Sequence, residues 1–289
     1  MIATAPRSRL ARPRRRLVST WPGRIALVVV LLVLAVAFLG PLFAPDSPSA
    51  QVGPAFSGPT SASPFGVDYD GADVLSRVLN GGHSVIIYGG LATVLGYLVG
   101  GTIGLIAGHR RGIVDSVLMR AMDVLLAFPP LIFLLLLGTG FGNSALALVF
   151  GIAIVHVPSI ARIIRTATLE VSVRGYVEAA VARGDRVRVI LRREILPNIA
   201  GTIVADAGPR FTVSILLVAA VNFLGLGVAP PAADWALMIS ENRLGLTLNP
   251  LSVLVPALMI GLLTVSLNVL ADSIAQRMGT SLDIEAMRR

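Results

Sequence analysis

The sequence contains no cysteine and no lysine, and charged residues of either sign are scarce, at 14% of its 289 residues. The absence of cysteine excludes disulfide bonds, thiolate nucleophiles and cysteine-ligated metal sites. The absence of lysine excludes the Gly-x-x-x-x-Gly-Lys-Ser/Thr loop with which P-loop proteins hold nucleotide phosphates, and it excludes a lysine Schiff base. The three histidines are far apart and show no metal-ligand spacing.

Apolar residues, in contrast, are abundant. They make up 55% of the chain, while the charged fraction is little more than half of the roughly 25% that is typical of soluble domains. This composition indicates a polytopic membrane protein. The net charge of +8 comes from arginines that flank the apolar runs, which is the pattern of topology signals and not of a nucleic-acid-binding face.

Six apolar runs are long enough to cross a membrane, so we expect an all-α fold with six transmembrane helices. The first run is too long for the apolar part of a cleaved signal peptide, which was the alternative. In chain order we expect a cytoplasmic basic tail (1–24), a first transmembrane helix (25–43), an extracytoplasmic loop (44–82), a core of five transmembrane helices (83–274) that includes a cytoplasmic loop (166–197), and a cytoplasmic C-terminal tail (275–289).

The distribution of arginine predicts the orientation of these spans. With six spans and both termini inside, only Arg77 and Arg243 of the 24 basic residues fall on the outer side, as the positive-inside rule requires. Four spans with two re-entrant segments fit this asymmetry less well.

The second span carries Gly96, Gly100, Gly104 and Gly108, each four residues from the next. Residues at this spacing share one helix face, and small residues there let a neighbouring backbone approach closely. We therefore expect this face to pack against another span.

One long arginine-rich stretch, 176–198, interrupts the apolar pattern. A stretch so charged must lie in water, on the positive side of the membrane, and we expect it to contact another protein. Its residues Glu178-Ala179-Ala180, Gly184 and Leu196-Pro197 have the spacing of the cytoplasmic signature of ABC importer permeases, which the chain resembles.

Further segments extend the resemblance to the dipeptide/oligopeptide/nickel branch of these permeases, in its second, shorter subunit. The matching segments are 63–77, 119–129, 223–235 and 267–272. Glu194 departs from the pattern, because histidine is usual there. The resemblance implies a type I importer permease fold, both termini inside, with a coupling helix that docks on a separate ATPase.

The residues that the resemblance assigns to ATPase coupling are Glu178, Ala179, Ala180, Gly184, Arg186, Glu194, Leu196 and Pro197. Glutamate and alanine favour helix, and Gly184 can end it with a left-handed cap. We expect a second short helix over 185–195, after which Pro197 begins the next span.

Five polar residues within the spans are candidates for the pathway or a gate: His156, Asp206, Arg210, Asn222 and Asn268. Asp206 and Arg210 lie four residues apart, on one helix face, and each is costly in lipid. We expect them to pair, as a structural or gate element in preference to a substrate ligand. His156 is expected to be a hydrogen-bonded packing residue in preference to a proton relay.

The resemblance implies a non-enzymatic permease subunit in the bacterial cytoplasmic membrane that imports di- or oligopeptides. Its implied partners are a second, homologous permease, two ATPase subunits or one dual ATPase chain, an external substrate-binding protein and the lipid bilayer. ATP and Mg²⁺ would be bound by the partners, with no cofactor or metal in this chain and no nucleic acid. The alternatives are import of nickel or another small chelate, and an ATP-independent carrier or channel.

Overall fold

The computed structural model describes residues 21–141, 144–227 and 231–286, and within them it contains helices and two isolated β-bridges. Most of the basic tail expected at 1–24 lies outside these residues. The elements are α1 (Trp21–Leu39), η1 (Gly40–Leu42), α2 (Val74–Asn80), α3 (His83–Arg110), α4 (Gly112–Leu126), α5 (Pro130–Phe141), α6 (Ala145–Ser172), α7 (Gly175–Ala182), α8 (Val187–Ile190), η2 (Leu191–Ile195), α9 (Leu196–Phe223), α10 (Trp235–Asn242), η3 (Arg243–Gly245) and α11 (Leu251–Ala286).

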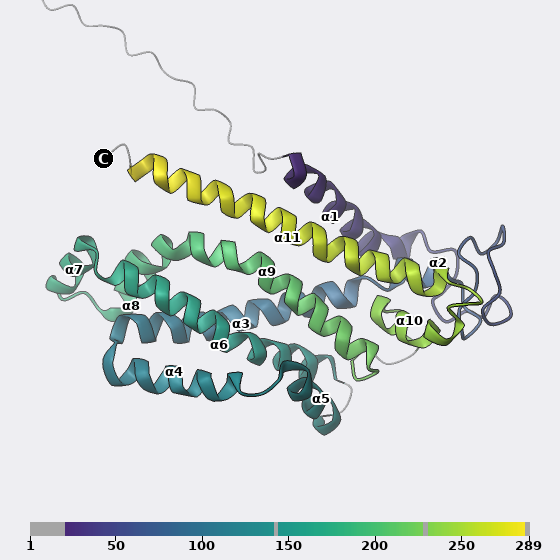
Figure 1. Ribbon diagram of the computed structural model, residues 1–289, viewed down its shortest axis with the longest axis horizontal. Coiled ribbons are helices and arrows are strands. Elements are labelled where there is room, and N and C mark those ends of the chain that lie inside the picture. The colour runs from purple at the N-terminus through teal and green to yellow at the C-terminus, as the bar shows by residue number, and fades with distance from the viewer. Residues whose placement is uncertain (1–20, 142–143, 228–230, 287–289) are drawn as a thin grey trace, which may run out of the picture.

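The long helices run side by side, with α7 and α8 at one end of the bundle and α2 and α10 at the other (Figure 1). Five helical segments in the described residues are long and apolar enough to cross a membrane. A sixth span results if α4 and α5, which meet at an angle of 80°, are counted together. The all-α prediction is confirmed, and the bent pair of α4 and α5 occupies the place of the third expected span.

The bend between α4 and α5 has a local cause. Pro129 and Pro130 lie at the break, have no backbone N–H to donate, and disfavour helical conformation in the residue before each of them. Helix α4 packs against both α3 and α6 and runs lengthwise beside α6 (Figure 1).

The centre of the bundle is the contact between α3 and α6. The expected glycine face of α3 makes this contact. A Cβ atom on Gly100 or Gly104 would collide with the backbone of Val157 or Ala161 on α6, so the two helices approach more closely than side chains would allow. The prediction of close packing through glycine is confirmed.

The expected outer loop is an ordered structure. Residues 44–82 and 231–249, here called the outer cap, fold together at one end of the bundle. The indole of Trp235 is fully buried and donates to the carbonyl of Val78 (2.8 Å), and the Asn249 amide donates to the carbonyls of Phe65 and Val67 (3.1 and 3.0 Å). These contacts join segments more than 150 residues apart.

The first and last helices pack against each other at the edge of the bundle. Helix α1 begins four residues before the expected first span and buries a narrow stripe that includes Val30, Val33 and Ala37, while residues such as Leu31 and Leu32 are exposed. Helix α11 continues without a break past residue 274 to Ala286, through most of the segment that was expected to be a tail.

Candidate coupling surface and transmembrane polar residues

The signature stretch lies at the end of the bundle opposite the outer cap (Figure 1). Residues 175–198, here called the coupling segment, begin with helix α7. Glu178 and Ala179 are exposed on α7, whereas Ala180 and Val177 are buried. The two alanines of the motif therefore differ. Ala179 lies on the exposed face of α7, and Ala180 packs against other helices of the same chain.

Gly184 ends α7 with φ at +77°. Its N–H donates to the carbonyl of Val181 (2.9 Å), and the N–H of Asp185 donates to the carbonyl of Ala180 (3.2 Å). These two bonds form a Schellman cap, in which the left-handed residue is usually glycine and sometimes asparagine. A Cβ on Gly184 would meet no atom within 4 Å, so the preference for glycine here comes from backbone conformation and not from lack of space.

The second half of the coupling segment differs from the expected short helix over 185–195. Helix α8 passes directly into one π-helical turn, η2, and then into α9, so a single helix runs from Val187 into the membrane. The cause is Pro197, which has no N–H for the carbonyl four residues earlier and whose ring would clash with it. The wider π turn accommodates this position, with the Leu196 N–H donating to Leu191.

The predicted coupling residues after Gly184 are mostly exposed. Arg186, Leu196 and Pro197 are exposed, while Glu194 is half-buried and its carbonyl accepts from the Asn198 side chain (2.6 Å). Arg183 and Asp185 form an exposed ion pair (2.8 Å) next to the Gly184 cap. The Glu194 carboxylate makes no ion pair among the described residues.

A small apolar core fastens the coupling segment to the spans. Its buried members come from α6, α7, α8, η2 and α9, and are Ile160, Ile164, Ala167, Val177, Ala180, Ile190, Ile195 and Ile199. Well-packed interiors deform little. The apolar core therefore ties α7 to α6 and α9 as one packed unit.

The predicted pair in α9 is present. Arg210 Nε donates to both carboxylate oxygens of Asp206 (3.2 Å each), and the hydroxyl of Tyr97 on α3 donates to the same carboxylate (2.6 Å). Both charged side chains are mostly buried, at 21% and 16% exposed. The pair therefore connects α9 to α3 inside the membrane.

His156 is buried and hydrogen-bonded, as expected. Its Nε2 lies 2.8 Å from the hydroxyl of Ser214 on α9, which in turn lies 2.8 Å from the hydroxyl of Thr93 on α3. The Thr93 hydroxyl also donates to the carbonyl of Gly89. These side chains join α3, α6 and α9 at one level of the bundle.

Asn222 and Asn268 are in different surroundings. Asn222 is fully buried at the end of α9 and hydrogen-bonds Asp234 at the start of α10, where Asp234 accepts from the backbone N–H of Ala236 and Leu237 and from Ser84. Asn268 is exposed on α11. Of the five predicted pathway residues, Asp206, Arg210 and His156 therefore make two contacts at the centre of the bundle. Asn222 makes a contact near the outer cap, and Asn268 is exposed.

The sequence did not predict the polar contacts of the outer cap. Buried Arg77 pairs with Asp68 and Glu241 (2.8 Å to Glu241), and Tyr69 donates to Glu241 (3.2 Å). Burial raises the pKa of Glu241, with Arg77 opposing it, and burial also raises the pKa of Tyr69. The sequence contained one signal for these contacts, because Arg77 is one of only two arginines expected on the outer side.

No group of His, Asp and Glu side chains suited to hold a metal ion occurs in the part of the chain that the structure describes. The polar clusters above are instead hydrogen-bonded sets that join separate segments of the chain. Their chemistry is suited to position and couple helices.

Comparison with known proteins shows a family match. Residues 100–280 match the family described as binding-protein-dependent transport system inner membrane component. This range contains the coupling segment, and it covers more than half of the chain.

Curated relatives are similar over most of their length. The chain is 34% identical to the glutathione transport system permease protein GsiD of Pectobacterium atrosepticum over 247 residues, which is 85% of this chain and 82% of the relative. It is 30% identical to the dipeptide transport system permease protein DppC of Alkalihalophilus pseudofirmus over 252 residues, 86% of this chain and 83% of the relative.

Solved structures share the fold. A chain from the inward-facing MetNI methionine ABC transporter superposes with a TM-score of 0.57 at 16% identity, covering 71% of this chain and 95% of that one. A chain from an amino acid ABC transporter superposes with a TM-score of 0.50 at 22% identity, covering 67% and 90%. The helical arrangement is therefore that of ABC transporter permeases.

Proposed function

The chain belongs to the family of binding-protein-dependent transport system inner membrane components, and we propose that it is one of two permease subunits of an ATP-driven peptide importer. It is a multi-pass protein of the bacterial inner membrane and a transport component, not an enzyme. Both of its termini lie on the cytoplasmic side in this proposal.

The observation that carries the proposal is the coupling segment. Exposed Glu178 and Ala179 present a helical surface, the Schellman cap at Gly184 fixes where α7 ends, and buried Ala180 ties α7 to α6 and α9. A surface that is open on one side and rigidly packed on the other is suited to receive a push from another protein. An ATP-independent carrier or channel has no use for such a surface.

The proposed partners follow from the family. A second, homologous permease completes the pathway, ATPase subunits dock on the coupling segment and bind ATP and Mg²⁺, and an external binding protein delivers cargo to the outer cap. The absence of lysine supports a separate ATPase, because this chain cannot form a P-loop.

Peptides are the proposed cargo, because relatives similar over more than four fifths of the chain are glutathione and dipeptide permeases. Glutathione is itself a tripeptide, so both names describe short peptides. These relatives favour peptides over nickel as the cargo.

The central polar contacts are the proposed gate. Asp206 with Arg210 and Tyr97, and His156 with Ser214 and Thr93, each join α3 to α9. Helix α9 also continues from the coupling segment. Movement of α7 and α8 would therefore strain these contacts and change how α9 sits against α3.

The test is transport in proteoliposomes that contain this chain, the partner permease, the ATPases and the binding protein. We expect uptake of labelled di- and tripeptides that requires ATP and is inhibited by unlabelled glutathione or dipeptides. Uptake without the ATPases would contradict the importer, while ATP-dependent uptake of nickel in preference to peptides would retain the importer and overturn the cargo.

A further inference from the structure

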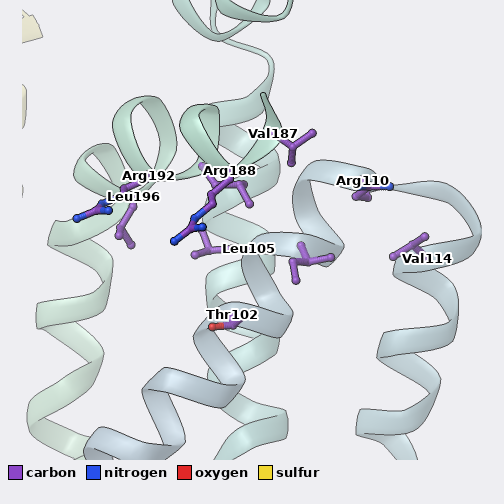
Figure 2. A pocket seen from close by; sticks show the side chains of 10 residues that line it. Thr102, Leu105, Arg110, Val114, Val187, Arg188, Arg192 and Leu196 are labelled. Atoms are coloured by element: carbon purple, nitrogen blue, oxygen red, sulfur yellow. The ribbon is translucent and has the colours of Figure 1, made fainter. Parts of the chain in front are cut away.

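A cavity of about 670 Å³ opens at the cytoplasmic end of the bundle, and the second half of the coupling segment forms one of its walls (Figure 2). It lies where α3, the start of α4 and the α8–η2–α9 helix come together. This inner pocket is separate from the exposed face of α7, and none of the residues that line it is acidic.

The rim of the inner pocket is positively charged. Arg110 comes from the end of α3, and Arg188 and Arg192 come from α8 and η2. No ion pair joins any of the three to a carboxylate in the described part of the chain. Three guanidinium groups around one opening attract an anion, and phosphate accepts paired N–H donors well.

The depth of the inner pocket is apolar. Thr102, Leu105 and Ile106 lie on one face of α3, one to two helical turns before Arg110, and helical rise places Thr102 about 12 Å further into the membrane than the rim. Figure 2 shows the Arg188 side chain extending from α8 toward Leu105. This guanidinium points toward the membrane and away from the cytoplasmic end.

We propose that the inner pocket binds an anionic phospholipid of the inner leaflet, with its phosphate among Arg110, Arg188 and Arg192 and its glycerol and upper acyl chains along Leu105 and Ile106. The inner pocket has charged side chains at its rim and apolar side chains beneath them. A phospholipid has the same order, with a charged headgroup followed by apolar acyl chains. Basic pockets between helices on the cytoplasmic side are suited to acidic headgroups.

The direction of Arg188 decides between a lipid and a protein occupant. An acidic side chain of a cytoplasmic ATPase would approach from the end of the bundle, toward the exposed face of α7. A lipid phosphate lies at the membrane surface, between the guanidinium groups and the apolar floor. The inner pocket also adjoins η2, so the bound lipid would brace the π turn where the coupling segment enters the membrane.

The experiment measures lipid retained by the full chain, purified in detergent together with the partner subunits that co-purify with it. Native mass spectrometry counts bound phosphatidylglycerol, with phosphatidylcholine as the neutral comparison. We expect preferential retention of phosphatidylglycerol, reduced on the order of tenfold by the double substitution Arg188→Gln/Arg192→Gln, because each arginine near the surface contributes to anionic-lipid binding.

The matched control is Arg174→Gln/Arg193→Gln, which removes the same charge at exposed positions that do not line the inner pocket, one at the start of α7 and one in η2. Its phosphatidylglycerol retention should stay within twofold of the wild type. Equal loss in both double variants would overturn the proposal, since general attraction to basic residues would then be sufficient.

A second variant tests the apolar depth without altering charge. Leu105→Trp fills the floor of the inner pocket, so this variant should retain less phosphatidylglycerol. In the wild type, soluble glycerol phosphate should fail to compete with the lipid. Competition by glycerol phosphate at concentrations matching the lipid would show a simple phosphate site and overturn the lipid assignment. Loss of the ATPase from the Arg188→Gln/Arg192→Gln complex with unchanged lipid would show a protein contact instead.

Discussion

Gly184 has a positive φ and empty space around it, so its contribution is conformational. A residue with a Cβ costs about 1–2 kcal/mol in the left-handed region. We expect Gly184→Ala to loosen the end of α7 and reduce peptide uptake several-fold, while ATP hydrolysis continues. The ratio of peptide transported to ATP hydrolysed in proteoliposomes measures this uncoupling.

Two companion substitutions make the Gly184 result specific. Gly175, at the start of α7, also has no atom within 4 Å of the place that a Cβ would take, but it lacks a positive φ, so Gly175→Ala should leave the ratio unchanged. Gly184→Asn should have a higher ratio of transport to hydrolysis than Gly184→Ala, because asparagine tolerates the left-handed region better than alanine. Equal effects of alanine at both positions would argue against the role of the cap.

Asp206 and Arg210 form a mostly buried pair within α9. Removing either partner leaves the other charge without compensation in the membrane, so Asp206→Asn and Arg210→Gln should each lower the thermal unfolding temperature. The double variant should lose less than the sum of the two, with an interaction free energy of about 0.5–3 kcal/mol. Strictly additive losses would mean that the two side chains do not act as a pair.

At the scale of elements, the contact of α3 with α6 depends on the absence of side chains. A Cβ on Gly104 would meet the backbone carbonyl of Ala161 and the Cβ of Ile164, and backbone cannot move aside cheaply. We expect Gly104→Ala to destabilise the protein by roughly 1–3 kcal/mol, as overpacking does in well-filled cores. Thermal unfolding in detergent gives the measurement.

Gly101 provides the matched control on the same helix, because no atom lies within 4 Å of a Cβ there. Gly101→Ala should be neutral or slightly stabilising, by up to about 1 kcal/mol, since alanine is the better helix former. If both substitutions had the same effect, close packing of α3 and α6 would not explain the glycine spacing.

The coupling segment shows which parts of an element could be predicted. The helix at 178–180 and its end at Gly184 follow from local preferences, and both are present. The π turn before Pro197 was not predicted, because a proline is compatible both with the start of a new helix and with a distortion inside a longer one. Packing of Ile190, Ile195 and Ile199 into one core keeps the helix continuous.

At the scale of the whole molecule, the outer cap is held by the buried set of Asp68, Arg77 and Glu241. Burial raises the pKa of Glu241 above its ordinary value of 4.5. The folded cap therefore binds a proton more readily than the unfolded chain, and the Glu241 contribution to stability is complete below pH 4.5 and declines as pH rises through the folded pKa.

We accordingly expect backbone amides of the outer cap to exchange hydrogen more slowly, after correction for intrinsic exchange rates, at mildly acidic pH than at neutral pH. Glu241→Gln should flatten this dependence, because the amide does not titrate. Hydrogen exchange followed by mass spectrometry resolves the cap from the helices. A wild-type slope that persists in Glu241→Gln would assign the pH dependence to other groups.

Membrane insertion, the number of apolar runs and the family were determined by the sequence alone. These features depend on composition, on the placement of arginine and on local spacing such as 178–197, all of which are properties of short segments. The glycine face of α3 and the pairing of Asp206 with Arg210 also follow from helical periodicity, because residues four apart share a face.

Only the tertiary structure decided which distant side chains meet. The contacts of Tyr97 with Asp206, of His156 with Ser214 and of Arg77 with Glu241 join residues 58 to 164 positions apart, and no local preference specifies them. The inner pocket is likewise made by two distant segments, 102–114 and 187–196. Helical periodicity defines the faces of a span, but the packing of all spans together determines what each face contacts.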